Sequence, residues 1–263
     1  MILEWALLGT VAAMTWAILR GGWLPPGGAQ PIHAGGSGIL LALISVVGAV
    51  YFFGLSGGLA LILSVVVHEY GHVAAFRVAG HSDARFRLIP LVGGVAISAR
   101  PPATPAHDLF ITIMGPGICL IAMAAAWRLA LGMPTTSAGA GLFLVQFASI
   151  TGALNLFNLL PIYPLDGGRI AALTLGRFAP EGVRRALMGI SLLIVAYSVL
   201  SFSFLILLFA LISFKAAKDL NPHAMARRPL DVGMAINGLF AWAAMSGAFA
   251  LGGWAIFRGF LPG

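Results

Sequence analysis

Two histidines and a glutamate stand together near the end of an apolar run, in the stretch Val67-His68-Glu69-Tyr70-Gly71-His72. On a helix His68 and His72 lie one turn apart on one face, as two ligands of a tetrahedral zinc ion require. Glu69 is rotated by about 100° on that helix and can reach a water on the metal without occupying a coordination position. This spacing predicts a hydrolase. The alternative, a chance occurrence on a solvated helix, is weak because ionisable groups in an apolar span are costly without partners or a metal.

A zinc ion held by two histidines needs a further protein ligand, and Asp166 is the simplest choice. Its carboxylate is a hard oxygen donor, and it follows an apolar span in a stretch with two prolines and two glycines. Irregular backbone at membrane depth is tolerated only where protein or water covers it, so an aspartate there is a candidate for function. The competing interpretation is a turn residue, since Leu-Asp-Gly-Gly is good turn chemistry.

Other potential ligands are weaker candidates. His81, Asp83 and His107 follow the histidine motif, but none has a partner at ligand spacing, so we expect them to be solvated. A different class of zinc protease would use a downstream glutamate as third ligand. The chain offers only Glu181 after His72, and Glu181 stands next to Pro180.

The composition predicts an all-α polytopic membrane protein. Apolar residues make up 60% of the 263 residues and charged residues only 9%, whereas about 25% of residues are charged in soluble domains. The net charge of +7 comes from basic residues at the ends of apolar segments, where membrane orientation explains them, so no nucleic-acid partner is implied. Cys119 is the only cysteine; it excludes a thiolate zinc cluster and an intramolecular disulfide, and we interpret it as a packing residue.

Eight apolar segments are expected to form membrane spans, the first of them a retained span rather than a signal peptide. They are Ile2–Leu19, Gly38–Phe53, Leu59–Val78, Leu109–Leu131, Gly139–Leu160, two within Arg184–Phe214, and Gly233–Phe257. The second and third spans should form an antiparallel hairpin through a tight turn at Leu55–Gly58. Pro116 should distort the fourth span, and its neighbouring glycines should allow another helix to approach closely.

Charge decides how many spans lie in Arg184–Phe214, which as one helix would measure about 46 Å against a hydrocarbon core of roughly 30 Å. Dividing it near Ser201-Phe202-Ser203 leaves only Arg128 and Arg258 on one face, so thirteen of the fifteen basic residues share the other. The positive-inside rule makes that second face cytoplasmic. Both termini then face away from the cytoplasm, and His68, His72 and Asp166 lie at cytoplasmic span ends.

A polar stretch separates the third span from the fourth. Within it, short apolar and β-branched runs around Gly93-Gly94 predict a small β-hairpin at the membrane interface. We therefore divide the chain into residues 1–56 with two N-terminal spans, residues 57–170 with a three-helix catalytic core and both motifs, and residues 171–263 with three C-terminal spans.

The two motifs together resemble the site-2 protease family of intramembrane zinc metalloproteases. His68-Glu69-Tyr70-Gly71-His72 is followed, after the Gly115-Pro116 span, by Asn-Leu-Leu-Pro-Ile-Tyr-Pro-Leu-Asp-Gly-Gly at residues 158–168. The resemblance covers about residues 57–170. It implies one Zn²⁺ per chain, held by His68, His72 and Asp166, with Glu69 as catalytic base and Asn158 as a polar group near the reacting carbonyl.

The resemblance also implies a function. The expected enzyme is a zinc metalloendopeptidase that hydrolyses a peptide bond in or near a transmembrane segment of a membrane-protein substrate, as in regulated intramembrane proteolysis. We expect neither a PDZ insertion between the two motifs nor a nucleotide-binding tail, so the resemblance is to the compact branch. A prokaryotic inner membrane, with the active site near the cytoplasmic side, is the expected location. The alternatives are a metal transporter, for which we see no internal repeat, and an inactive membrane-protein binder.

Overall fold

The computed structural model describes residues 2–24, 36–89, 93–134, 138–254 and 256. Most of the loop predicted at Gly21–Ser37 lies outside these residues. The chain divides into two compact units. The first comprises Met1–Pro102, Met114–Leu156 and Gly247–Gly263, and the second comprises Ala103–Ile113 and Phe157–Ser246.

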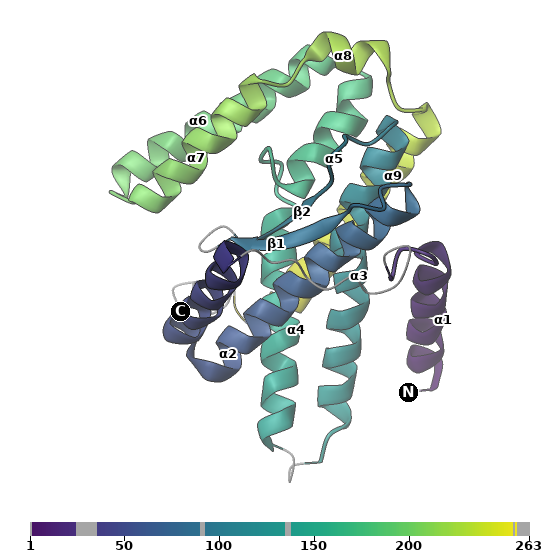
Figure 1. Ribbon diagram of the computed structural model, residues 1–263, viewed down its shortest axis with the longest axis vertical. Helices are drawn as coiled ribbons and strands as arrows, with labels where there is room; N and C mark the ends of the chain where they lie inside the picture. The colour runs from purple at the N-terminus through teal and green to yellow at the C-terminus, as the bar shows by residue number, and fades with distance from the viewer. Residues whose placement is uncertain (1, 25–35, 90–92, 135–137, 255, 257–263) are drawn as a thin grey trace. The chain divides into compact units, whose positions relative to one another are not determined.

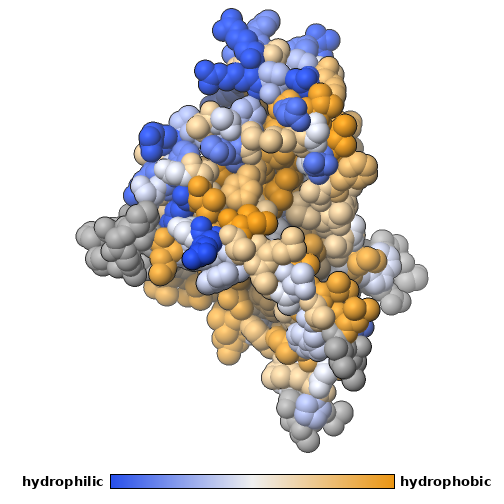
Figure 2. All heavy atoms as spheres, turned by 90° about the vertical axis from the view of Figure 1, so that its right-hand side faces the viewer, coloured by the Kyte–Doolittle hydropathy of each residue, from blue (hydrophilic) through white to orange (hydrophobic). Residues whose placement is uncertain are grey.

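In the described part of the chain, five helices are long and apolar enough to cross a membrane, and the helix α1 (Ile2–Ile18) is apolar but shorter. The five are α2 (Gly36–Val78), α3 (Pro105–Gly132), α4 (Ala138–Asn158), α6 (Pro180–Leu200) and α9 (Val232–Gly252). Large apolar side chains remain exposed on them, among them Leu200 at 80% and Phe240 at 72%, and Figure 2 shows broad hydrophobic areas on the visible face. Apolar surface on this scale suits lipid rather than water. The chain is a multi-pass membrane protein, as its composition predicts.

The long helix α2 changes direction near its middle. Gly54 has φ 71° and ψ 170°, a backbone conformation that favours glycine. A Cβ added to Gly58 would meet the backbone of Val50 and Ala49 at 2.6–2.7 Å, although eight residues of straight helix span about 12 Å. The chain therefore folds back on itself here, as the tight turn predicted at Leu55–Gly58 requires, and the reversal begins at Gly54.

The second half of α2 packs antiparallel to α3. A Cβ on Gly71 would overlap the Met114 carbonyl oxygen and approach the Gly115 Cα to 3.0 Å. Seven residues before Gly71, the Ser64 carbonyl lies 3.9 Å from the Cys119 Sγ. The predicted close approach at the glycines of the fourth span is confirmed, and α3 continues through Pro116 as one helix.

The same half of α2 runs parallel to α4. The Ser64 and Thr151 hydroxyl oxygens are 2.6 Å apart, and the His68 Nδ1 is 2.8 Å from the Asn155 Oδ1. Moving four residues along α2 thus moves the contact four residues in the same direction along α4. Parallel packing agrees with the topology expected from the basic residues, in which the third and fifth spans end at the same face.

Two short strands follow α2. The strands β1 (Arg85–Ile89) and β2 (Gly93–Ile97) pair antiparallel, with Arg85 opposite Ile97, and both pack against α2. Just before β1, Asp83 accepts hydrogen bonds from the Ala99 backbone N–H at 2.5 Å and from the Ser98 hydroxyl at 3.2 Å. The bond from Ala99 lowers the pKa of Asp83 most, and its own backbone N–H and the Ser98 hydroxyl lower it further, which together outweigh the effect of burial. The location of this sheet at a membrane interface stays a prediction.

The second unit contains the helix pair α6 and α7 (Phe204–Lys218), which lie side by side in Figure 1. Between them the chain turns at Phe202, which has φ 51°, and the Ser203 N–H bonds to the Ser198 carbonyl at 3.0 Å. The break predicted near Ser201-Phe202-Ser203 is therefore confirmed. The short elements of this unit are α5 (Asp166–Thr174), the 3₁₀ turn η2 (Leu175–Arg177) and α8 (Pro222–Arg227).

Candidate metal centre

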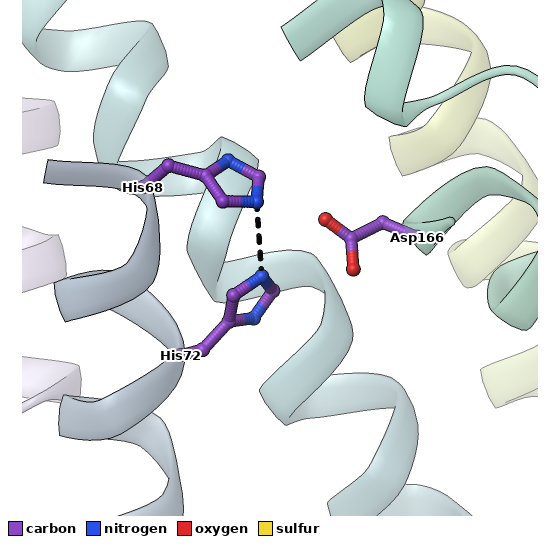
Figure 3. Close-up of side chains that lie close together, drawn as sticks. All are labelled: His68, His72 and Asp166. Carbon is purple, nitrogen blue, oxygen red and sulfur yellow. Dashed lines mark hydrogen bonds between the residues drawn. The ribbon is translucent and has the colours of Figure 1, made fainter. Parts of the chain in front are cut away.

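His68 and His72 present their Nε2 atoms to each other. Both side chains are buried on α2, at 4% and 6% exposure. The two Nε2 atoms are 3.1 Å apart, and the rings meet edge to face with an interplanar angle of 81° (Figure 3). The helical spacing of four residues produces this arrangement, as the sequence predicts.

The histidine pair fits a zinc ion. Two nitrogens bound to a tetrahedral zinc at about 2.0–2.1 Å lie roughly 3.3 Å apart, close to the 3.1 Å between the two Nε2 atoms. Neutral imidazole is also a ligand that zinc prefers. Spacing and donor type therefore both suit a metal ion beside these two rings.

A glycine of α3 leaves room for the His72 ring. A Cβ placed on Gly115 would overlap the Nε2 and Cε1 atoms of His72. Because alanine or anything larger would displace the ring, the absent side chain at position 115 is what allows the imidazole to take its observed orientation. The next helical glycine, Gly117, has only the Met114 Cε within reach of an added Cβ, at 3.7 Å.

Glu69 lies under the second strand. Its side chain is 7% exposed, and a Cβ on Gly94 would overlap the Glu69 Cγ and come within 2.8 Å of its Oε1. Gly94 of β2 thus leaves the space that this carboxylate fills. The sequence predicted strands around a Gly-Gly pair, but it carried no signal that one of these glycines packs on Glu69.

The sequence analysis also missed a partner of His68. Asn155 is fully buried on α4, and its Oδ1 lies 2.8 Å from the His68 Nδ1. Its Nδ2 donates to the Thr151 carbonyl at 2.9 Å. The available signal was the polar spacing of Thr151 and Asn155, four residues apart on a mostly apolar helix, which matches the spacing of Ser64 and His68.

Asp166 begins α5 in the second unit. It is 8% exposed, and its position in the first turn of a helix favours a carboxylate. The next two residues need to be glycine. A Cβ on Gly167 would overlap the Leu159 carbonyl, and one on Gly168 would lie 2.5 Å from the Tyr163 backbone nitrogen. The preceding chain therefore wraps tightly around the start of α5.

Further contacts fix the start of α5 and the residues before it. Arg169 on α5 forms a salt bridge of 2.5 Å with Asp108 on α3. Burial lowers the pKa of Arg169, but the carboxylates of Asp108 and Asp166 more than offset that effect, so its pKa is raised. The Trp242 Nε1 on α9 donates to the Leu159 carbonyl at 2.8 Å, which satisfies one backbone group of the irregular stretch.

The residues that the sequence proposed for the site lie in different surroundings in the structure. His68 and His72 belong to the first unit and Asp166 belongs to the second, and Figure 3 labels all three. Asn158 is the half-buried last residue of α4. The expectation that His81 is solvated is wrong: His81 is 4% exposed, and its Nδ1 lies 2.8 Å from the Ser98 hydroxyl, where it helps to anchor the end of β2.

Known proteins resemble this chain in sequence. The model of peptidase family M50 matches residues 132–198. The putative zinc metalloprotease Rip3 of Mycobacterium tuberculosis is 33% identical over 136 residues, which cover 51% of this chain and 34% of the relative. Stage IV sporulation protein FB of Bacillus subtilis is 31% identical over 122 residues, which cover 46% of this chain and 41% of the relative.

A solved structure, the site-2 protease from Methanocaldococcus jannaschii, is 23% identical with a TM-score of 0.46, and the match covers 70% of this chain and 88% of that one. The sequence matches confirm the resemblance to the site-2 protease family, and the M50 match includes Asn158 and Asp166. This chain spans about a third of the Rip3 length and two fifths of the sporulation protein.

Proposed function

We propose that this chain, whose residues 132–198 match peptidase family M50, is an intramembrane zinc metalloprotease. It would hydrolyse a peptide bond in or near a transmembrane segment of a membrane-protein substrate. The observation that carries the proposal is the buried pair of Nε2 atoms 3.1 Å apart, on an apolar helix that also bears Glu69. Buried ionisable groups on a membrane helix are costly, so their presence together favours function over packing.

In this proposal His68, His72 and Asp166 hold one zinc ion per chain. A bound zinc ion polarises a carbonyl oxygen and lowers the pKa of a water molecule to about 7. Gly115 leaves the space that the His72 ring occupies in the first unit. Gly167, Gly168 and the Arg169–Asp108 salt bridge fix the start of α5, and with it Asp166.

Glu69 would move the protons of the reaction. Its carboxylate accepts a proton from the attacking water and returns it to the leaving amine, which makes it both general base and general acid. The Asn158 amide would donate a hydrogen bond to the oxygen on which negative charge develops. A substrate helix hides its carbonyls in backbone hydrogen bonds, so the substrate must unwind locally before it can react.

The finer topology is also part of the proposal. The α2 reversal and the α6–α7 break would give eight spans, with both termini away from the cytoplasm and the site near the cytoplasmic face of a prokaryotic inner membrane. Residues 57–170 would form the catalytic core, with two spans before it in the chain and three after it. Single cysteines placed at 103–107, 176–182 and 221–226 should label from one face, and the native Cys119 is fully buried. Labelling of 176–182 and 221–226 from opposite faces would disprove the eight-span arrangement.

Glu69→Gln tests the proposed chemistry. The amide keeps the shape of the side chain and leaves all three ligands, so zinc content and fold should be unchanged. Cleavage of a membrane-protein substrate by purified protein should fall by at least about 10² to 10⁴-fold, the usual contribution of general acid–base catalysis. Fragments are quantified with zinc content measured on the same samples.

The alternatives predict different results from the same series. A metal transporter would show altered metal flux and no peptide fragments from either protein. If the protein is an inactive binder, the wild type and the Glu69→Gln variant would bind the substrate equally well, and neither would cleave it. Undiminished proteolysis by zinc-loaded Glu69→Gln protein would exclude the proposed mechanism.

A further inference from the structure

We propose that Asn155 is a positioning residue of the metal centre, which acts by fixing the ring orientation and tautomer of His68. This inference rests on the zinc site of the proposed function. It starts from the hydrogen bond of 2.8 Å between the His68 Nδ1 and the Asn155 Oδ1, made between two side chains that are 4% and 0% exposed.

The second hydrogen bond of Asn155 determines which way its amide faces. The Nδ2 donates to the Thr151 carbonyl at 2.9 Å, and a carbonyl oxygen can only accept. The Oδ1 must then face His68, and because an amide oxygen also only accepts, the proton belongs on the His68 Nδ1. In a neutral imidazole this leaves the lone pair on Nε2, the atom that faces His72.

Burial makes this orientation depend on Asn155. No water can replace the amide at a side chain with 0% exposure, and in a low-dielectric interior an unsatisfied Nδ1–H is unfavourable. Without Asn155, the His68 ring would gain by rotating or by moving its proton to Nε2. Either change removes the lone pair from the metal side of the ring. Residues that orient a ligating histidine in this way typically contribute 10–100-fold to metal affinity.

A competing explanation is that Asn155 only fastens α4 to α2. The chain offers a control for this, because the Ser64 and Thr151 hydroxyl groups make the same kind of polar contact one turn earlier, at 2.6 Å. Thr151→Val removes that contact, preserves the side-chain shape and leaves the Thr151 carbonyl that Asn155 needs. If helix fastening were the only role, losing either contact should have similar consequences.

The experiment measures zinc affinity by chelator competition on purified full-length protein, with helical content and monodispersity checked for each variant. Asn155→Leu, which is similar in size but accepts no hydrogen bond, should bind zinc 10–100-fold more weakly than the wild type. Asn155→Asp retains an acceptor for the His68 Nδ1 and should stay within about threefold of the wild type, as should Thr151→Val. Where Asn155→Leu does not fold, Asn155→Ala takes its place with the same expectation.

Each other outcome overturns the inference. Unchanged affinity in Asn155→Leu removes the positioning role, and an equal loss in Thr151→Val assigns the effect to helix packing. A loss in Asn155→Asp as large as in Asn155→Leu would mean that the acceptor oxygen is not what matters. A second readout is the visible spectrum of the cobalt-loaded protein, which should change in Asn155→Leu and not in Thr151→Val. A wild-type chain that binds no zinc would refute the proposed function as well, whereas zinc-loaded wild type with unaffected variants refutes this inference alone.

Discussion

His68 and His72 project from a regular helix, whereas Asp166 begins a short helix that follows the irregular residues 159–165. The two histidines need only the helical repeat to share a face, while one side chain on α4 contacts the His68 ring and a glycine on α3 leaves room for the His72 ring. Asp166 has no such repeat to place it. Its position depends on how the preceding backbone folds around α5.

The irregular segment has its own means of support. Gly167 and Gly168 allow backbone to lie directly on the first turn of α5, and the Trp242 indole satisfies the Leu159 carbonyl. The Arg169–Asp108 salt bridge ties the same turn to α3. Zinc binding in the histidine region should therefore be sensitive to side chains that touch the rings. In the Asp166 region it should be sensitive to any change that moves the preceding backbone away from α5.

The largest effect should come from removing the only proposed ligand of the irregular region. Asp166→Asn keeps the size of the side chain but weakens the ligand and removes its charge, so purified protein should lose most of its zinc. Metal content is measured by elemental analysis after dialysis. Asp219→Asn is the control, since Asp219 is an exposed carboxylate at the C-terminal end of α7 and is no proposed ligand, and it should retain zinc. Full zinc occupancy in Asp166→Asn would make Asp166 a turn residue only.

On the histidine side, Gly115→Ala tests whether a ring can be displaced by one methyl group. The added Cβ overlaps the His72 imidazole, and a ligand moved from its productive geometry should cost about tenfold or more in zinc affinity. Gly117→Ala is the control on the same helix, because its Cβ has an ordinary contact at 3.7 Å. Equal zinc affinity in the two variants would show that the His72 ring has room to adjust, and the claimed sensitivity of this region would be wrong.

Sequence reasoning succeeded where local periodicity or chain-wide charge decides the structure. The spacing of His68 and His72 predicted a shared face, and the distribution of basic residues predicted the break that the structure places at Phe202. Both depend on properties that can be read along the chain. The expected role of Glu69 came from its helical position beside the histidines and from the family resemblance, that of Asn158 came from the resemblance alone, and both stay predictions.

Sequence reasoning failed for contacts that depend on how two elements of the structure align. Asn155 reaches His68 only because α2 and α4 pack in parallel with one particular register. Gly94 covers Glu69 only because β2 crosses that point of α2. His81 is buried where the chain after β2 comes back to it, and there its ring contacts the Ser98 hydroxyl. No spacing within one segment encodes such contacts.

The smallest effect should come from a glycine of the irregular region. Gly168→Ala places a Cβ 2.5 Å from the Tyr163 backbone nitrogen and the Ile162 carbonyl carbon, so backbone rather than a flexible side chain has to move. Overpacking of this kind typically costs about 1–3 kcal/mol. Gly182→Ala, in the first turn of α6, meets only the Ala179 Cβ at 3.5 Å and should be neutral or stabilising by up to about 1 kcal/mol, since alanine is the better helix former. Thermal unfolding in detergent, with zinc retention followed in parallel, distinguishes the two variants. If Gly168→Ala unfolds at the same temperature as the wild type and keeps its zinc, the chain around α5 is more adaptable than its close contacts indicate, and the contrast with the histidine region disappears.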